Sequence, residues 1–466
     1  MQLKVSEIRE ILSAPGPKLD AVSTGYSIDS RTMRPGDLFF AIHGEKFDGH
    51  AFVADVLAKG AVGAVIAKSH AAEFSALDAS RLLVVDSTLD ALQRLARAVR
   101  ERWHGRVIGV TGSVGKTTTK EAIARVLGSR WRVLKSHGNL NNGYGMPLQL
   151  LKVQLDDAMA VLEMGMSSAG EIAALARIAE PDWGVVTVVA PVHIEFFADG
   201  MEGVARAKRE LIDALPADGV AFLNADDARV ADFAKRTKAR VVKFGWRAAA
   251  DVGATTVKDL GAEGTEFVLE ASGERSACHL KLIGLHNVTN ALAAAAVGVE
   301  AGLSVAECAA ALADMLPPES RGQTLRMGGA FLINDCYNSN PLALEAMVDA
   351  LASVEARRRI VIAGEMLELG QEAESLHAAS GRYIAAKKMD WLVGVRGQAR
   401  AMVDAARSAG MKAIYFETPE EAGNWLAENL RAEDAVLLKA SRGVRLERAL
   451  ERLVERRKPA NVPGKV

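Results

Sequence analysis

The most constraining feature of the sequence is the stretch VIGVTGSVGKTTTKEAI, which spans residues 107–123. An apolar run of strand length leads into it, glycines and one lysine form its centre, and a pattern with helical spacing follows. A strand that ends in such a loop and opens a helix directs several backbone N–H groups and the positive end of the helix dipole at one spot. The stretch therefore predicts a phosphate-binding loop between a buried strand and a helix.

The loop is a compact version of this motif. The common form has four residues between its first glycine and the Gly-Lys pair, and Val110 stands where that glycine would be. We expect the ammonium group of Lys116 to lie beside phosphate and the hydroxyl of Thr117 to meet a magnesium ion that bridges the outer phosphates. A glycine-rich turn with a chance lysine is the alternative. We interpret the loop as an ATP site formed by Thr111, Gly112, Ser113, Val114, Gly115, Lys116, Thr117 and Thr118.

The pattern of apolar runs predicts the fold class. Runs of strand length alternate with helical patterns through the middle of the chain, as in RVIGVTG, AMAVLEMG and GVAFLNADD, and a second series begins near residue 330. Such alternation is typical of parallel sheets covered on both faces. A length of 466 residues and a Pro-Pro turn at 317–318 suggest three domains. We expect an α/β protein with a central P-loop domain (105–318), a small N-terminal α/β domain (1–104) and a Rossmann-like C-terminal domain (319–466).

Composition excludes several classes of protein. The 57 basic and 58 acidic side chains nearly cancel, so no global field directs the chain to nucleic acid or lipid. The sequence shows neither a membrane-spanning run nor a secretory signal. Three scattered cysteines fit neither a disulfide framework nor a CxxC metal site, which indicates reduced thiols in the cytoplasm. No exposed apolar stripe calls for a partner, so we expect a monomer.

Polar side chains follow two further strands. Glu163 ends the run AVLEMG, and His193 lies just past VVTVVAPV. Ligands gather at the carboxyl ends of parallel strands, so these residues together with Thr117 predict a second divalent-cation site, although His193 alone is more typical of a polar loop. Lys208 lies between Arg206 and Arg209 in the helical stretch GVARAKRELIDAL. Its spacing alone favours a solvated basic helix face.

Motifs along the whole chain resemble those of the Mur ligases, the ATP-dependent amide-forming enzymes of peptidoglycan precursor synthesis. The segment SIDSRTMRPGDLFFAIHGEKFDGHAF resembles the family's uridine-nucleotide-binding domain, and TGSVGKTTTKEAI matches its compact phosphate loop. GLHNVTNALAAAA resembles the adenine-side motif, SRGQ the interdomain arginine, and LLKASRGVRLERAL the C-terminal signature. The resemblance implies a ligase that activates a carboxylate with ATP.

Four stretches resemble one branch of the family, which adds D-alanyl-D-alanine to UDP-N-acetylmuramoyl-tripeptide. They are SHGNLNNGYGMPLQLL, EMGMSSAGEI, NDCYNSNPLALEAMVDAL and IAGEMLELGQEAESLH. The sequence leaves open whether the third residue of the tripeptide is meso-diaminopimelate or lysine. One alternative is a sibling ligase or a folylpolyglutamate synthase that adds a single amino acid, and another is a P-loop nucleotide switch. The GNLNN and YNSNP stretches argue against the former, and a complete nucleotide-sugar domain argues against the switch.

The resemblance also implies roles for particular residues. It places the UDP-sugar peptide on Ser30, Arg31, Gly44, Asp48, Asn139, Asn141 and Asn142. It adds His286, Asn287, Arg321 and Asp335 to the ATP site, and it places D-alanyl-D-alanine on Tyr337, Asn338 and Asn340, with Ser441 and Arg442 on the inner face of the last domain.

For Lys208 the resemblance implies a carbamylated lysine. Its carbamate would give an oxygen ligand to a second magnesium ion, beside Glu163 and His193. Formation of the carbamate needs a neutral amine, which we expect crowding by Arg206, Arg209 and bound metal to favour. Lys116, Lys208 and His193 are therefore the expected catalytic residues.

Overall fold

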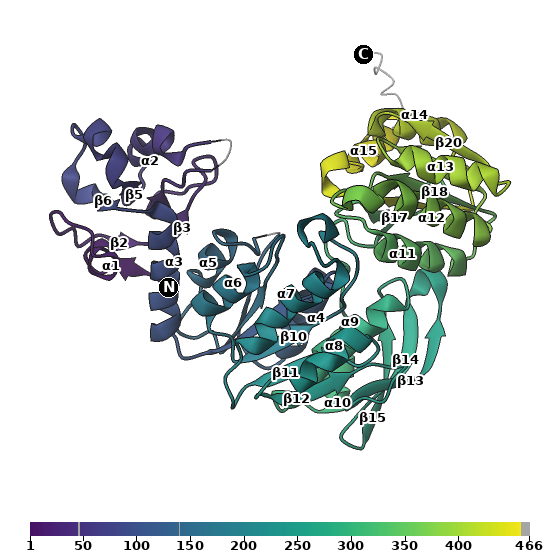
Figure 1. Ribbon diagram of the computed structural model, residues 1–466, viewed down its shortest axis with the longest axis horizontal. Coiled ribbons are helices and arrows are strands. Elements are labelled where there is room, and N and C mark those ends of the chain that lie inside the picture. The colour runs from purple at the N-terminus through teal and green to yellow at the C-terminus, as the bar shows by residue number, and fades with distance from the viewer. Residues whose placement is uncertain (45–46, 139, 458–466) are drawn as a thin grey trace, which may run out of the picture.

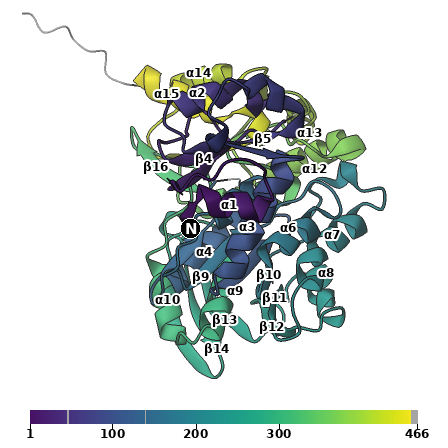
Figure 2. The same cartoon turned by 90° about the vertical axis from the view of Figure 1, so that its left-hand side faces the viewer.

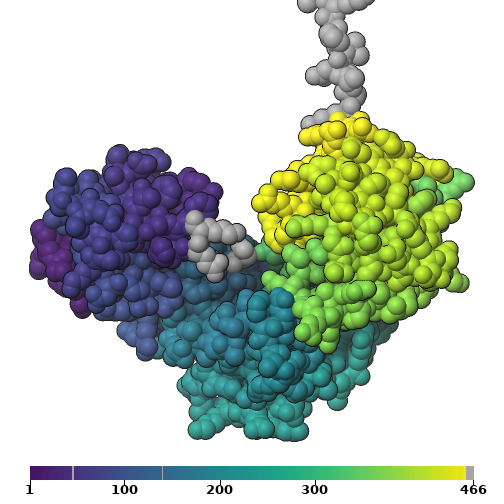
Figure 3. All heavy atoms as spheres, turned by 45° about the horizontal axis from the view of Figure 1, so that its top comes forward, coloured from purple at the N-terminus to yellow at the C-terminus, as the bar shows by residue number. Residues whose placement is uncertain are grey.

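The computed structural model of the protein describes residues 1–44, 47–138 and 140–457. Three α/β bodies follow one another along the chain, and the first and the last rise on either side of the central one (Figure 1). A space-filling view shows a cleft between them, with the central body as its floor (Figure 3). Asn139, one of the predicted substrate residues, lies outside the described residues.

The N-terminal body is built on a parallel sheet. Its strand order is β3 (Gly25–Ser27), β4 (Asp37–Phe40), β5 (Gly63–Ala67) and β6 (Leu82–Val85). An antiparallel pair, β1 (Leu3–Lys4) and β2 (Val22–Ser23), lies beside it. The helices are α1 (Val5–Leu12), α2 (Val53–Ala58) and α3 (Thr88–Arg102), with short 3-10 turns η1 (Gly49–Phe52), η2 (Lys68–Phe74) and η3 (Ala79–Arg81).

The central body contains a nine-stranded sheet in the order β15-β14-β13-β12-β11-β10-β7-β9-β8. Its parallel part comprises β7 (Arg106–Thr111), β8 (Val133–Lys135), β9 (Met159–Glu163), β10 (Trp183–Val186), β11 (Val220–Asn224) and β12 (Arg240–Phe244). The strand β13 (Val252–Asp259) continues it in parallel, and β14 (Thr265–Ala271) and β15 (Glu274–Leu280) then run antiparallel. The predicted α/β class with a central parallel sheet is confirmed, and the antiparallel extension is an addition to it.

Helices cover both faces of the central sheet. One face carries α4 (Lys116–Leu127), α9 (His286–Glu300) and α10 (Val305–Ala313), whose apolar residues share one core with the antiparallel strands. The other carries α5 (Gly145–Leu150), α6 (Glu171–Ala179) and α7 (Met201–Asp213). The remaining elements are α8 (Ala228–Asp232), η4 (Ile194–Phe196), η5 (Phe233–Lys235) and η6 (Gly261–Glu263).

The C-terminal body is a six-stranded sheet with an apolar core on each face. The strand order is β16 (Gln323–Met327), β17 (Ala330–Asp335), β21 (Asp434–Lys439), β18 (Arg358–Gly364), β19 (Trp391–Val395) and β20 (Ala413–Phe416), and β16 alone of these is antiparallel to its neighbour. The helices are α11 (Pro341–Ser353), α12 (Ala373–Ala386), α13 (Ala399–Ser408), α14 (Pro419–Asn429) and α15 (Glu447–Arg457), with η7 (Gly370–Glu372) and η8 (Arg442–Val444).

The two junctions between the bodies differ. The helix α3 packs on α1 and also on α5 and α6, and Figure 2 shows it beside α1. Its buried Leu92, Leu95 and Val99 belong to one apolar core that spans the first two bodies. The C-terminal body rests on the central one through α11, which contacts η6; a Cβ atom on Gly261 would lie 2.5 Å from the carbonyl oxygen of Ser353. Among the described residues, no helix has the length and apolarity needed to cross a membrane.

Candidate active site

The phosphate loop connects β7 to α4 and depends on its two glycines. Gly112 has φ +144° and Gly115 has φ +87°, conformations that side chains rarely adopt. A Cβ atom on Gly112 would lie 1.9 Å from Thr187 Oγ1, and one on Gly115 would lie 2.6 Å from Asn290 Oδ1. Neighbouring side chains therefore reach the loop backbone itself, which leaves no room for a larger residue at either position.

Lys116 begins α4 and folds back over the loop. Its Nζ donates to the carbonyl oxygens of Gly112 at 2.7 Å and Ser113 at 3.3 Å. Burial lowers the pKa of this lysine, the nearby Glu163 opposes the shift, and Arg321 adds to it. Arg321 comes from the start of the C-terminal body, so the charge of this predicted interdomain residue acts on the phosphate-loop lysine.

Glu163 is the centre of a cluster of oxygen and amide groups at the carboxyl edge of the sheet. It ends β9 opposite Val110 of β7 and is 3% exposed. Its two carboxylate oxygens accept from Thr117 Oγ1 at 2.8 Å and Asn141 Nδ2 at 2.9 Å. A buried carboxylate next to a hydroxyl oxygen is the hard ligand pair that magnesium prefers, so Thr117 and Glu163 fit the predicted ion. Asn141, predicted to meet substrate, here also orients Glu163.

Lys208 is buried, and the interpretation of its segment as a solvated basic face was wrong. Its side chain is 1% exposed on α7, and its Nζ makes no hydrogen bond to any other described residue. Burial first, and then the charge of Lys116, hold its pKa well below the usual range. The expected crowding by arginines was also wrong, because Arg206 pairs with Asp199 and Arg209 with Asp213 at the surface. Desolvation, with the charge of Lys116, therefore favours the neutral form of the Lys208 amine, while the charge of Glu163 opposes that shift.

His193 faces the C-terminal body. It follows β10 in a loop, adopts φ +60°, and places its Nδ1 atom 2.5 Å from Glu368 Oε2. The contact lowers the pKa of the Glu368 carboxyl group. The structure thus joins Thr117, Glu163 and the neighbourhood of Lys208 at one edge, while the described contact of His193 is with another domain.

The predicted adenine-side residues lie at the start of α9. Asn287 Nδ2 donates to Ile283 O at 2.8 Å, and Asn287 Oδ1 accepts from Asn290 at 2.9 Å. Asn290 Oδ1 in turn accepts from Thr119 Oγ1 on α4 at 3.1 Å. This chain of amides couples the start of α9 to the phosphate-loop helix. Burial lowers the pKa of the neighbouring His286 to about 4, so its imidazole is neutral at pH 7.

Asp335 forms an ion pair that the sequence did not reveal. It ends β17, and Lys439 ends the neighbouring parallel strand β21 in register with it. Lys439 Nζ lies 2.5 Å from Asp335 Oδ2 and donates to Asn338 O at 2.8 Å. The side chain of Lys439 is 4% exposed and that of Asp335 is 13% exposed. The rule that found Glu163, a polar residue at the end of a buried strand, would also have found Lys439.

The predicted D-alanyl-D-alanine residues follow β17. The centroid of the Tyr337 ring lies 3.9 Å from the guanidinium carbon of Arg321 and 5.7 Å from that of Arg442. Asn340 is the N-cap of α11, with Oδ1 accepting from Ala343 N at 2.9 Å, and Asn338 accepts from the next backbone N–H. Tyr337 is therefore the residue of this set that contacts Arg321, whose charge acts on Lys116. Ser441, also on this side, accepts from Leu367 N at 2.9 Å.

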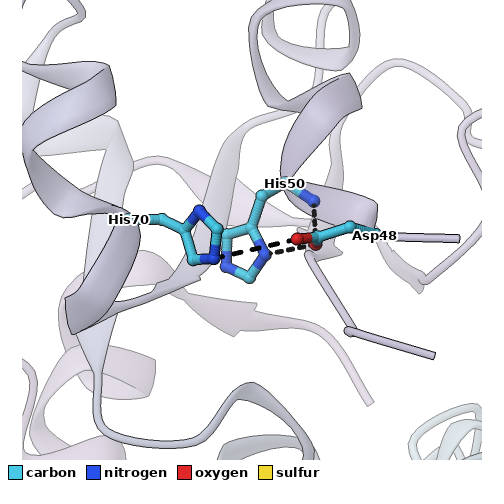
Figure 4. Close-up of side chains that lie close together, drawn as sticks. All are labelled: Asp48, His50 and His70. Atoms are coloured by element: carbon cyan, nitrogen blue, oxygen red, sulfur yellow. Dashed lines mark hydrogen bonds and ion pairs between the residues drawn. The ribbon is translucent and has the colours of Figure 1, made fainter. Parts of the chain in front are cut away.

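On the N-terminal body, Asp48 belongs to a histidine cluster (Figure 4). Its carboxylate lies 2.6 Å from His50 Nδ1, 3.3 Å from His43 Nδ1 and 3.7 Å from His70 Nε2. Asp48, His50 and His70 have the spacing of metal ligands, but His50 Nε2 already accepts from Ala67 N at 2.9 Å. Both nitrogens of His50 are occupied, so this cluster is a hydrogen-bond network that shapes the loop at residue 48.

The other predicted nucleotide-sugar residues have local contacts. Arg31 is exposed and pairs with Asp29 at 2.6 Å, next to Ser30 in a turn. Asn142 Oδ1 accepts from Gly145 N at 2.9 Å and so closes the turn before α5. Gly44 is exposed and donates its N–H to Phe47 O at 3.0 Å. Their predicted roles in substrate binding stay predictions.

Comparison with known proteins identifies the family. Residues 23–100, 110–298 and 320–442 match, in that order, the family descriptions "Mur ligase family, catalytic domain", "Mur ligase middle domain" and "Mur ligase, glutamate ligase domain". The chain is 34% identical, over 92% of its length and 93% of the relative, to the UDP-N-acetylmuramoyl-tripeptide–D-alanyl-D-alanine ligase of Bacillus subtilis. The chain belongs to the Mur ligase family. The resemblance noted in its motifs is thereby confirmed.

Other members of the Mur ligase family extend the match to structure. The ligase of the same name from Escherichia coli is 34% identical over 87% of this chain and 88% of its own. A crystal structure of MurF from Acinetobacter baumannii superposes with a TM-score of 0.88 at 29% identity, covering 98% of this chain and 99% of that one. MurF ligase from Thermotoga maritima in complex with ADP superposes with a TM-score of 0.81 at 28% identity, covering 93% and 98%. The three-domain architecture is therefore that of a Mur ligase.

Proposed function

We propose that this protein is the ATP-dependent ligase that joins D-alanyl-D-alanine to UDP-N-acetylmuramoyl-tripeptide and yields UDP-N-acetylmuramoyl-pentapeptide, ADP and phosphate. The similarity over nearly the whole chain to ligases of that name supports the branch. The observation that carries the chemistry is the buried cluster of Lys116, Thr117, Glu163 and Lys208 beside the phosphate loop. In this proposal, residues 1–104 hold the UDP-sugar, 105–318 bind ATP and 319–466 close over ATP and D-alanyl-D-alanine, in the cytoplasm.

The first step is activation of a carboxylate. The terminal carboxylate of the tripeptide attacks the γ-phosphate of ATP, giving an acyl phosphate and ADP. Two anions must approach where water is excluded, and their repulsion is the main barrier that the site must offset. Lys116 supplies a fixed positive charge, and Arg321, whose charge acts on Lys116 across the cleft, adds a second. His286, Asn287 and Asp335 complete the ATP site in this proposal.

Magnesium, when bound, would neutralise further charge on the phosphate oxygens. Thr117 and Glu163 would hold one ion, and Glu163, His193 and a carbamylated Lys208 would hold the second. The low pKa of Lys208 favours this modification, because only the neutral amine combines with carbon dioxide. The carbamate would replace the amine of Lys208, whose pKa is affected by the charge of Lys116, with an anionic oxygen ligand.

The second step forms the amide. The amine of D-alanyl-D-alanine attacks the acyl carbon, and the tetrahedral intermediate expels phosphate. We assign the dipeptide to the surface around Tyr337, Asn338 and Asn340, because Tyr337 is flanked by two arginines suited to a carboxylate. Positioning and charge neutralisation carry the catalysis, and no nucleophilic side chain is needed.

The test is ATP-dependent phosphate release with UDP-N-acetylmuramoyl-tripeptide, with and without D-alanyl-D-alanine. Free D-alanine and diaminopimelate serve as alternative amines, and tripeptides ending in diaminopimelate or lysine are compared. Release that requires tripeptide and dipeptide, with a pentapeptide product by mass, is the expected result. Release with another amine would move the assignment to a sibling ligase, and release indifferent to both substrates would indicate a nucleotide switch.

A further inference from the structure

The loop that follows β17 rests on one buried ammonium group. Lys439 ends β21, and its side chain is 4% exposed. Its Nζ donates to Asp335 Oδ2 at 2.5 Å and to Asn338 O at 2.8 Å. Hydrogen bonds from a charged donor are stronger than those between neutral groups, so a single side chain fixes both the last residue of the strand and the middle of the loop after it.

Three other contacts hold the rest of this loop. The N–H of Tyr337 donates to Ser320 O at 3.1 Å, and Ser441 Oγ donates to Ser339 O at 3.3 Å. Asn340 then caps α11. Each of these contacts joins neutral groups. The ammonium contact, which has a charged donor, should therefore contribute most to the position of the loop.

The ion pair and the loop both face residues of the proposed ATP site. Burial is the main cause of the low pKa of His286, and the charges of Asp335 and Lys439 act on it in opposite directions, the former raising the pKa and the latter lowering it. On the loop itself, the ring centroid of Tyr337 lies 3.9 Å from the guanidinium carbon of Arg321. The ammonium group thus supports a segment that lies beside both the adenine-side helix and the interdomain arginine.

We infer that Lys439 is a positioning residue that couples the nucleotide to the dipeptide, because it holds both the carboxylate of Asp335 and the carbonyl of Asn338. This inference rests on the proposed function, in which Asp335 belongs to the ATP site and Tyr337, Asn338 and Asn340 belong to the surface for D-alanyl-D-alanine. Loss of the ammonium group should therefore weaken both ligands in a protein that is still folded. A pair that only stabilised the sheet would change the unfolding free energy and neither affinity.

The experiment compares the full-length protein with Lys439→Gln and with a matched control, Arg358→Met. Glutamine keeps an amide donor but lacks the charge and the length of lysine. The control breaks another buried ion pair of β21, in which Arg358 Nη2 lies 2.6 Å from Asp434 Oδ2 and the side chain of Asp434 is 1% exposed. Asp434 begins the strand that Lys439 ends, so the control disturbs the same domain at the opposite end of the same strand.

Two measurements report the two ligands separately. Pentapeptide formation gives kcat and the KM for D-alanyl-D-alanine, and calorimetry gives the Kd of ADP, at a temperature where circular dichroism shows each variant folded. We expect Lys439→Gln to raise the KM for the dipeptide and the Kd of ADP by about 10-fold or more each. The value of kcat should change less, because a loss of uniform binding appears in KM. Arg358→Met should leave the KM and the Kd at their wild-type values.

A KM for the dipeptide that Lys439→Gln leaves unchanged, or that Arg358→Met raises equally, would overturn the inference. An increase in the Kd of ADP alone would also overturn it, because the ammonium group would then serve the nucleotide only. Wild-type protein that forms no pentapeptide would instead overturn the proposed function on which the inference rests.

Discussion

The buried ion pair between Lys439 and Asp335 allows a quantitative test of the C-terminal domain. With Nζ and Oδ2 2.5 Å apart, an effective dielectric constant of about 20 gives an attraction of roughly 6–7 kcal/mol. Removing two ions from water costs several kcal/mol for each, so the intact pair contributes little net stability. Lys439→Met, however, leaves the carboxylate of Asp335 buried and unpaired, which we expect to cost about 3–5 kcal/mol of unfolding free energy.

Replacing both partners should restore most of that loss. The double variant Asp335→Asn/Lys439→Met buries no net charge, so we expect its unfolding free energy to lie within about 2 kcal/mol of wild type. In a domain of this size Lys439→Met should lower the melting temperature of the C-terminal domain by roughly 6–20 °C.

Fluorine NMR of protein labelled with 5-fluorotryptophan can follow this domain separately. Trp391 and Trp425 lie in the C-terminal body, with ring centroids 5.3 Å apart, and the other four tryptophans lie outside it. Their signals should report the loss in Lys439→Met at a urea concentration where the other four are unchanged. A cost below about 1 kcal/mol, or effects of the single variants that simply add in the double variant, would refute the argument that the pair is buried and coupled.

Three further outcomes follow from the site. Burial lowers the pKa of His286 to about 4 from an ordinary value near 6.5, so the unfolded chain binds this proton first as the pH drops. Up to about 3 kcal/mol of unfolding free energy should therefore be lost between pH 6.5 and pH 4. In urea titrations, the unfolding free energy of His286→Gln should depend less on pH in this range. Gly112→Ala should cost about 1–3 kcal/mol and weaken ADP measurably by calorimetry, since its Cβ atom would meet Thr187 Oγ1 at 1.9 Å. With 13C-bicarbonate, the wild-type protein should give a carbamate NMR signal that Lys208→Arg lacks. The ligase rate of this variant should fall by about 100-fold or more. Absence of the signal from the wild-type protein would contradict the carbamate.

The parts of the site that were predicted from sequence depend on local rules. The phosphate loop is a contiguous motif, and Glu163 follows from the tendency of parallel strands to present ligands at their carboxyl ends. The central parallel sheet follows from apolar runs that alternate with helical patterns. The loop, and each strand with the helix that follows it, is defined by neighbouring residues, so a local sequence pattern is sufficient to show it.

Other features depend on packing between distant segments. Lys208 looks like part of a basic helix face, but α7 packs that side against the central sheet and leaves Arg206 and Arg209 outside. The partner of His193 lies 175 positions later in the chain, at Glu368, and no spacing rule links them. The strands β13 to β15 were missed because antiparallel strands with one exposed face alternate in polarity and lack continuous apolar runs.

The helix α3 has a consequence for how the molecule comes apart. Its buried leucines and Val99 belong to one continuous apolar core shared by the N-terminal and central bodies. The two cores of the C-terminal body, by contrast, include a single buried residue of the central body, Ile283. Cooperative unfolding follows shared cores more closely than sheets. The described residues form three sheets of four or more strands. The molecule should nevertheless melt as two units, with the N-terminal and central bodies losing structure together.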